Sequence, residues 1–162
     1  MTSEISLPSS NAVKIRLATP ENVPHLVELD RASGTAAHWS AEQYRDLFRP
    51  DFASPRVVLL AEASDGSVVG FLVARQVTPE WELENIVVSP PERRKGIGGA
   101  LLQALLEAVR QACGEAVLLE VRESNECARR FYSRAGFQQS GRRKAYYSNP
   151  LEDAVLYRLS LL

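Results

Sequence analysis

The chain has 162 residues, of which 45% are hydrophobic, 19 are basic and 20 are acidic. This length suffices for one domain with a buried core. A formal net charge of -1 excludes the broad positive surface of a protein that binds nucleic acids or anionic membranes by charge alone. No run of residues approaches the roughly 18 consecutive apolar residues of a membrane span.

Residues 1–12 are polar and lack the basic start and apolar run of a secretion signal. We expect a disordered lead-in there, followed by a single domain over residues 13–162. Cys113 and Cys127 match no disulfide framework and no zinc-ligand spacing. This use of cysteine favours a reducing compartment, so the expected location is the cytoplasm.

In the first half of the chain, strand and helix patterns alternate. Alternating apolar residues predict a strand over residues 13–17, and Thr19-Pro20 starts a helix that continues to about residue 32. Ser40 and Gln43 have the spacing of a capping box and predict a second, short helix. Three further strands are expected to form an antiparallel meander with a hairpin turn at Asp65-Gly66: residues 56–63, 67–77 and 81–88.

In the second half, a basic, glycine-rich loop opens a helical pattern that ends at Gly114. Residues 116–121 form an apolar run typical of a strand covered on both faces. Because a helix joins this strand to the preceding one, the two are expected to be parallel. A further helix over residues 125–134 and two closing strands over residues 138–143 and 154–161 complete a mixed α/β fold class.

The glycine-rich loop is the most informative stretch: Arg93, Arg94, Lys95, Gly96, Ile97, Gly98 and Gly99. Glycines let the backbone approach a ligand closely, and the first amides of a helix point toward an anion at its positive end. That geometry suits a pyrophosphate. Taken alone, the loop is equally consistent with a solvated basic turn, and it matches neither the Walker loop nor the dinucleotide fingerprint.

The loop resembles the pyrophosphate loop of the GNAT acetyltransferases, Arg/Gln-x-x-Gly-x-Gly/Ala, at Arg93, Gly96 and Gly98. Further segments, in order, resemble the RimI-type ribosomal-protein-alanine N-acetyltransferases: residues 85–90, 119–125, 131–132, 135–137, 146–147 and 152–154. The resemblance extends over nearly the whole chain from Arg16 onward. It implies a mostly antiparallel sheet of about six or seven strands, with one splayed parallel pair and about four flanking helices.

The resemblance also implies an activity. The chain is expected to transfer an acetyl group from acetyl-coenzyme A, its only cofactor and without a metal, to the α-amine of a protein N-terminus. The most specific acceptor that the resemblance implies is the N-terminal alanine of a small-subunit ribosomal protein. Expected coenzyme contacts are the strand residues Ile86, Val87 and Val88, the loop residues Arg93 to Gly99, and Asn125, which is also an ordinary helix N-cap.

Glu120 and Tyr132 are the candidate catalytic residues. Glu120 interrupts an apolar strand, where a carboxylate is costly unless it is paired, protonated or functional. The resemblance assigns Glu120 as the general base, directly or through a water, and Tyr132 as the proton donor to the departing thiolate. The alternatives are an ion pair of Glu120 with Arg122 or Arg143, and core packing for Tyr132.

Other reactive side chains are read as structural. His25 and His38 lack metal-ligand spacing, Cys127 is assigned to packing, and residues 142–144 to a solvated face without direct nucleic-acid contact. Two residues depart from the RimI-like pattern on the acceptor side: His38 stands where Pro is common, and Ala145 where Asn is common. A GNAT enzyme for another amine and a non-catalytic acetyl-coenzyme A module therefore stay open as alternatives, and a monomer or weak dimer is expected.

Overall fold

The computed structural model describes residues 12–50 and 54–162 of the chain. Apart from Ala12, the predicted lead-in over residues 1–12 lies outside the described residues. The strands are β1 (Lys14–Leu17), β2 (Arg56–Glu62), β3 (Val68–Val77), β4 (Glu80–Val88), β5 (Ala116–Arg122), β6 (Gln138–Tyr147) and β7 (Glu152–Ser160). The helices are α1 (Val23–Ala32), α2 (Ala41–Asp46), α3 (Ile97–Gln111) and α4 (Glu126–Arg134), with 3₁₀ turns at Pro20–Asn22 and Pro90–Glu92.

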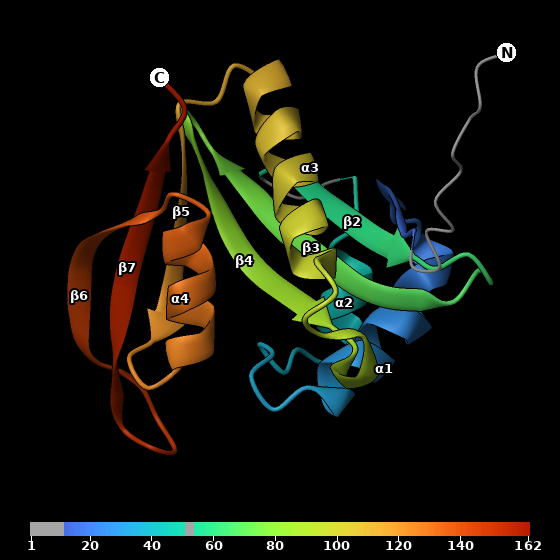
Figure 1. The fold of residues 1–162 in the computed structure, drawn as a ribbon, viewed down its shortest axis with the longest axis horizontal. Coiled ribbons are helices and arrows are strands. Elements are labelled where there is room, and N and C mark those ends of the chain that lie inside the picture. The colour runs from blue at the N-terminus through green and yellow to red at the C-terminus, as the bar shows by residue number, and fades with distance from the viewer. Residues whose placement is uncertain (1–11, 51–53) are drawn as a thin grey trace, which may run out of the picture.

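These strands form one seven-stranded sheet in the order β1-β2-β3-β4-β5-β7-β6. Helices α3 and α4 lie on one face of the sheet, and α1 and α2 lie on the other (Figure 1). The predicted mixed fold, mostly antiparallel with one parallel pair and four α-helices, is confirmed.

Each face of the sheet has its own hydrophobic core. Beneath α3, Leu101 and Leu105 are fully buried on the helical face that the apolar spacing predicts. Beneath α1 and α2, Leu26 and Tyr44 pack on Phe71 of β3. Strands β2, β3 and β4 thus contribute residues to both cores, whereas β5 contributes only to the core beneath α3.

The local signals for helix starts and turns are confirmed. The Ser40 hydroxyl accepts the Gln43 N–H at 3.1 Å, and the Gln43 side chain accepts the Ser40 N–H at 2.8 Å, which completes the capping box of α2. Gly66 has φ +86°, which allows the tight turn between β2 and β3.

The parallel pair β4–β5 is short. Its register runs from Glu80 opposite Ala116 to Glu82 opposite Leu118 and stops there. Beyond that point the two strands diverge, as Figure 1 shows, and residues 83–88 of β4 remain paired with β3 alone. The splay opens a gap between the C-terminal halves of β4 and β5.

A β-bulge at Glu84 reverses the side-chain alternation of β4. Ala74 of β3 is opposite Leu83, whereas Val73 is opposite Asn85, so Glu84 is the extra residue. Before the bulge, Leu83 faces the core beneath α3; after it, Asn85 faces α1 and α2. Apolar periodicity alone did not predict this change.

Two details of the predicted strands are wrong. Strand β5 is covered on one face only, because Leu118 and Glu120 are half-buried and line a cavity of about 230 Å³ on the face opposite α3. Strand β6 continues to Tyr147, four residues past the predicted end at residue 143. Both differences lie next to the candidate site.

Candidate active site

The C-terminal half of β4 presents free backbone groups to the gap. The Ser89 N–H donates to the Val69 carbonyl at 2.8 Å, and hydrogen-bonded pairs alternate along an antiparallel ladder. Val87 therefore bonds to β3, while the N–H and C=O groups of Ile86 and Val88 point toward the splay. A ligand that carries its own amides can pair with these groups.

The loop before α3 has the backbone geometry of an anion-binding turn. Arg94 and Gly96 have φ values of +63° and +84°, and the Gly96 carbonyl accepts the Ala100 N–H at 3.0 Å. The amides at positions 97–99 precede this first helical bond and have no acceptor within the helix. Three amides and the positive end of the α3 dipole therefore point out of the helix N-terminus.

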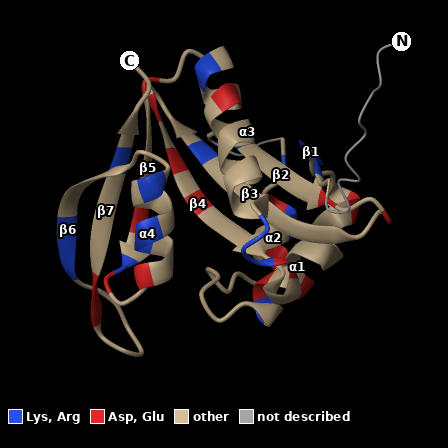
Figure 2. Ribbon diagram, in the orientation of Figure 1, with Lys and Arg blue, Asp and Glu red and all other residues tan. Residues whose placement is uncertain are grey.

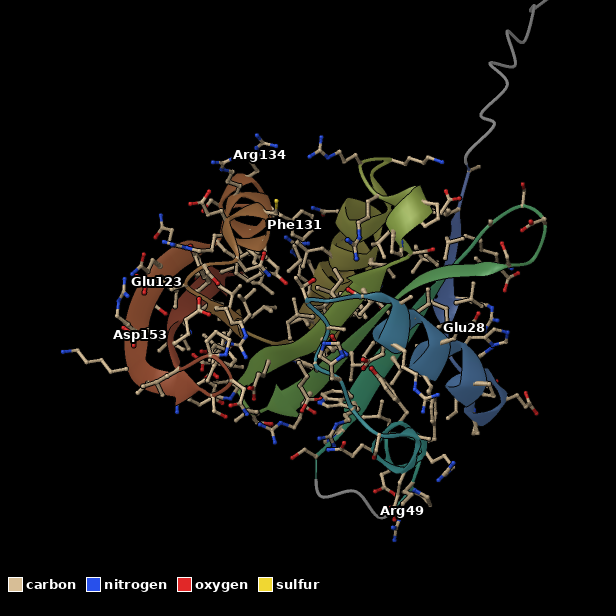
Figure 3. All side chains as sticks on the ribbon, turned by 90° about the horizontal axis from the view of Figure 1, so that it is seen from below. Glu28, Arg49, Glu123, Phe131, Arg134 and Asp153 are labelled. Carbon is tan, nitrogen blue, oxygen red and sulfur yellow. The ribbon has the colours of Figure 1, made fainter. Side chains whose placement is uncertain are left out.

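Helix α4 packs against this N-terminus. A β-carbon added to Gly98 would lie 3.5 Å from Cζ of Phe131, an ordinary van der Waals distance, so the ring of Phe131 lies directly beside the first turn of α3. Figure 3 shows Phe131 on the side of α4 that faces α3, and Arg134 at the end of α4. The anion-binding turn therefore opens beside the gap between β4 and β5.

The three basic side chains of the loop have different surroundings. Lys95 Nζ is 3.1 Å from a Glu92 carboxylate oxygen. Arg93 donates from Nε to the Val88 carbonyl at 3.2 Å and from Nη2 to the Ser33 hydroxyl at 3.1 Å. The exposed Arg94 has no hydrogen-bond or ion-pair partner among the described residues, so its guanidinium is available to an anion.

Asn125 is the N-cap of α4. Its Oδ1 accepts the Ala128 N–H at 3.2 Å, as the sequence predicts. The predicted coenzyme contact of Asn125 is compatible with this role, because the side-chain amide N–H₂ has no partner in the described part of the chain.

Glu120 pairs with Arg143, not with Arg122. The Glu120 carboxylate lies 3.1 Å from Arg143 Nε, with 20% of the glutamate side chain exposed, while Arg122 pairs with Glu152 at 3.3 Å. A hydrogen bond to Glu120 is also the main cause that raises the pKa of Tyr146 above its ordinary value. Glu120 is therefore a half-buried carboxylate beside a guanidinium and a phenol, at the wall of the cavity described above.

Tyr132 belongs to α4, and its side chain packs into the core on the opposite face of β5. Its side chain is 6% exposed and its ring centroid is 5.6 Å from that of Phe137. The core-packing alternative is thus correct for the ring. Its hydroxyl has no hydrogen-bond partner among the described residues, and burial raises the pKa of Tyr132, with a smaller contribution from Tyr147.

Tyr147 is electrostatically coupled to both candidates. Its pKa is raised mainly by burial and then by the Glu120 charge, and it in turn raises the pKa of Tyr132. Its ring lies beneath the Arg122 guanidinium, 4.4 Å from the ring centroid to Cζ. Glu120 and Tyr132 thus lie on opposite faces of the sheet, and both are close enough to Tyr147 for electrostatic interaction.

A buried polar network beside the gap was missed in the sequence. The Tyr44 hydroxyl donates to the Asp30 carboxylate and accepts from Asn85 Nδ2 at 3.0 Å. The same carboxylate accepts the Trp39 N–H at 3.1 Å. Burial, and then Asp30, raises the pKa of Tyr44, so its hydroxyl stays protonated. The network ties the loop between α1 and α2 to β4; the helical spacing of Tyr44 indicated burial but not its partners.

The two residues that depart from the RimI-like pattern both have a left-handed backbone. His38 has φ +57° and its Nδ1 lies 3.2 Å from Asp30 Oδ1; Ala145 has φ +51° and donates its N–H to Asp153 Oδ1 at 2.9 Å. Proline cannot adopt a positive φ, whereas asparagine tolerates it. The histidine therefore gives this loop a conformation that proline excludes, and the alanine keeps a conformation that asparagine favours.

Charge is distributed unevenly around the site. Figure 2 shows basic residues on α4 and on the loop ahead of α3, and acidic residues along β4. In the described part of the chain, no group of three or more His, Cys, Asp or Glu side chains is arranged to hold a metal ion. Across residues 12–50 and 54–162, no helix has the length and hydrophobicity needed to cross a membrane.

Comparison with known proteins gives one consistent family. The model of the acetyltransferase (GNAT) family matches residues 23–137. The N-alpha-acetyltransferase RimI of Mycobacterium tuberculosis is 36% identical over 115 residues, which cover 68% of this chain and 71% of the relative. The ribosomal protein bS18-alanine N-acetyltransferase of Escherichia coli is 33% identical over 99 residues, which cover 60% of this chain and 67% of the relative.

The fold comparison agrees with the sequence comparison. The crystal structure of the ribosomal-protein-S18-alanine N-acetyltransferase from Escherichia coli matches with a TM-score of 0.81 and 25% identity, over 93% of this chain and 94% of that chain. The splayed strands and the amide-lined helix N-terminus lie within the matched residues. The chain therefore belongs to the GNAT family and is an N-acetyltransferase.

Proposed function

We propose that the chain acetylates the α-amine of a protein N-terminus, and that its acceptor is an alanine-initiated ribosomal protein of the small subunit. The observation that carries the proposal is the splay of β4 from β5, with an anion-binding turn on one side and the Glu120 carboxylate on the other. The names of the relatives from Escherichia coli supply the acceptor. A ribosomal acceptor implies a reaction in the cytoplasm. We further propose that residues 13–162 act as one domain and that the enzyme is a monomer or weak dimer.

The free groups of the site fit acetyl-coenzyme A, the acetyl donor of the GNAT family. The backbone of Ile86 and Val88 offers hydrogen bonds to the amides of its pantetheine arm, alongside Val87. The amides of Ile97, Gly98 and Gly99, with Arg94 beside them, offer donors to its diphosphate. Lys95, Gly96 and Asn125 complete the proposed coenzyme surface, and no metal is required.

Glu120 is proposed to remove a proton from the acceptor amine. An α-amine has a pKa of about 7.7 to 8.0, so at neutral pH most of it is protonated and cannot attack. The carboxylate lies at a cavity wall and retains 20% exposure, which leaves it accessible to an amine or to a bridging water. Arg143 and Tyr146 orient the carboxylate through the ion pair and the hydrogen bond that they make with it.

Tyr132 is proposed to donate the proton that the departing thiolate requires. Burial raises its pKa, so the hydroxyl stays protonated at every pH at which the enzyme works. Its lack of a hydrogen-bond partner among the described residues leaves the proton free for transfer. The bound coenzyme supplies the acetyl thioester, and the two side chains handle the protons on either side of it.

A second acceptor class is favoured by a specific observation. His38 and Ala145 both lie on the acceptor side, and both depart from the RimI-like pattern. A small-molecule amine is therefore the competing acceptor. The experiment compares three acceptors: an alanine-initiated peptide, a peptide with a blocked N-terminus and an internal lysine, and a polyamine. The acetylated product of each is measured by mass spectrometry.

The proposal predicts the highest kcat/KM for the alanine-initiated peptide. A higher value for the polyamine or the blocked peptide would exclude N-terminal acetylation as the main activity. Gly98→Asp tests the donor site, because it adds a negative charge where the diphosphate is expected. Gly98→Ala is its matched control, because a β-carbon there makes only an ordinary contact with Phe131, 3.5 Å away.

A further inference from the structure

Arg93 opens the glycine-rich loop, yet its guanidinium is already hydrogen-bonded to two other parts of the chain. Its Nε donates to the Val88 carbonyl at 3.2 Å, and its Nη2 donates to the Ser33 hydroxyl at 3.1 Å. Val88 ends the strand proposed to hold the pantetheine arm, and Ser33 ends α1, 60 residues away in sequence. One side chain thus joins the coenzyme strand to the start of the loop between α1 and α2.

We propose that Arg93 is a positioning residue that couples the coenzyme strand to the acceptor-side loop at positions 33–40, and not a ligand of the coenzyme phosphates. The inference rests on the proposed function only in taking positions 33–40 as the acceptor side. The remaining steps rest on the contacts of Arg93 and of the loop itself.

The Val88 carbonyl has no partner strand at the splay. The ladder with β3 directs it into the gap, where no strand reaches it. Arg93 satisfies this carbonyl with its Nε–H. The arginine therefore holds the last residue of β4 in place while leaving the Val88 N–H and both polar groups of Ile86 to a ligand.

Ser33 is a suitable anchor for the other end. It is 3% exposed, its N–H donates to the Asp30 carbonyl at 3.1 Å, and its hydroxyl lies 3.5 Å from that of Thr35. A buried hydroxyl with a fixed backbone loses little entropy when it accepts the guanidinium N–H. The arginine bond thus holds the loop where it leaves α1.

The far end of the loop is held by the network around Asp30. Its carboxylate accepts the Trp39 N–H and contacts His38, and Tyr44 links it to Asn85 of β4. The loop is therefore attached to β4 twice, through Asn85 at one end and through Arg93 at the other. Loss of either attachment frees part of the acceptor-side wall while leaving the anion-binding turn intact.

Arg93→Met keeps the length of the side chain and removes its donors, and Ser33→Ala removes the acceptor. Arg94→Met is the matched control, because Arg94 is the neighbouring arginine and has no partner among the described residues. Amide hydrogen exchange of positions 33–40 is measured on the full chain without ligands. The dissociation constant of coenzyme A is measured by calorimetry, and KM for the alanine-initiated peptide by mass spectrometry.

We expect faster exchange at positions 33–40 in Arg93→Met and Ser33→Ala, by about three- to tenfold, as for the loss of one ordinary hydrogen bond. The two changes combined should add little, because they remove the same bond. Peptide KM should rise by a similar factor, while coenzyme A affinity falls only in Arg94→Met. Unchanged exchange in both variants overturns the proposal, as does a loss of coenzyme A affinity in Arg93→Met equal to that in Arg94→Met.

The readouts separate this proposal from the proposed function. If the wild-type chain acetylates no peptide, the acceptor assignment fails, but the exchange rates of positions 33–40 still decide whether Arg93 holds the loop. If the peptide is acetylated and the exchange rates do not change, only the role of Arg93 fails.

Discussion

Replacing Glu120 with Gln keeps the shape of the side chain and removes its ability to accept a proton at neutral pH. It also breaks the ion pair with Arg143, whose Nε lies 3.1 Å from the carboxylate. The matched variant Arg143→Gln breaks the same ion pair and keeps the carboxylate. Comparison of the two separates catalysis by Glu120 from its structural pairing.

The structure gives the size of each effect. The side chains of Arg143 and Glu120 are 58% and 20% exposed, so solvent screens the pair and its loss costs less than about 1 kcal/mol of stability. A change of the same size in the activation free energy alters turnover by only about fivefold. Removal of a positioned general base lowers turnover by about 10²- to 10⁴-fold. Glu120→Gln should therefore be far less active than Arg143→Gln, with nearly equal thermal stability.

The assay is the initial rate of acetylation of an alanine-initiated peptide between pH 6 and pH 9.5. As the pH rises past the α-amine pKa of about 7.7 to 8.0, more acceptor is already deprotonated. The deficit of Glu120→Gln should therefore shrink at high pH, while that of Arg143→Gln stays constant. Equal activities for the two variants across this range would refute the assignment of Glu120 as the base.

Three further changes test other parts of the site. Tyr132→Phe should lower kcat by about 10²-fold without changing the affinity for coenzyme A in calorimetry, and unchanged kcat would make Tyr132 a core residue only. Because burial raises the pKa of Tyr132, the wild-type rate should not decline below pH 10. Ala145→Asn should raise the free energy of unfolding by about 0.5 to 1 kcal/mol in urea denaturation, because φ is +51°, and a lower value would contradict the strain. His38→Pro should cost more than about 1 kcal/mol in the same assay, because proline cannot adopt φ +57°; equal stability would be the contrary result.

Features that depend on nearby residues could be predicted from the sequence. The capping residues Ser40 and Asn125 start helices as expected, because a cap needs only an oxygen and an amide three residues on. The parallel strand pair followed from the helix that joins β4 to β5. The resemblance to a family predicted pyrophosphate binding by the loop at positions 93–99, whereas the glycines alone were equally consistent with a solvated turn.

Features that depend on contacts between distant segments could not be predicted. The bulge at Glu84 reverses which face of the sheet the following side chains of β4 point to. The Glu84 carboxylate pairs with Arg56 of β2 at 3.0 Å, a partner that periodicity cannot identify. The Asp30 network joins two helices to a strand, so its members are not related by any sequence spacing. The hydrogen bond from Arg93 to Ser33 could not be predicted for the same reason, since Ser33 follows α1, 60 residues earlier in the sequence.

The central claim is that the chain transfers acetyl from acetyl-coenzyme A to a protein α-amine. The most direct measurement uses one peptide that carries both an N-terminal alanine and an internal lysine, incubated with the chain and acetyl-coenzyme A and sequenced by tandem mass spectrometry. The account predicts a single acetyl group on the alanine α-amine, whereas acetylation of the lysine, or of neither amine, would contradict it.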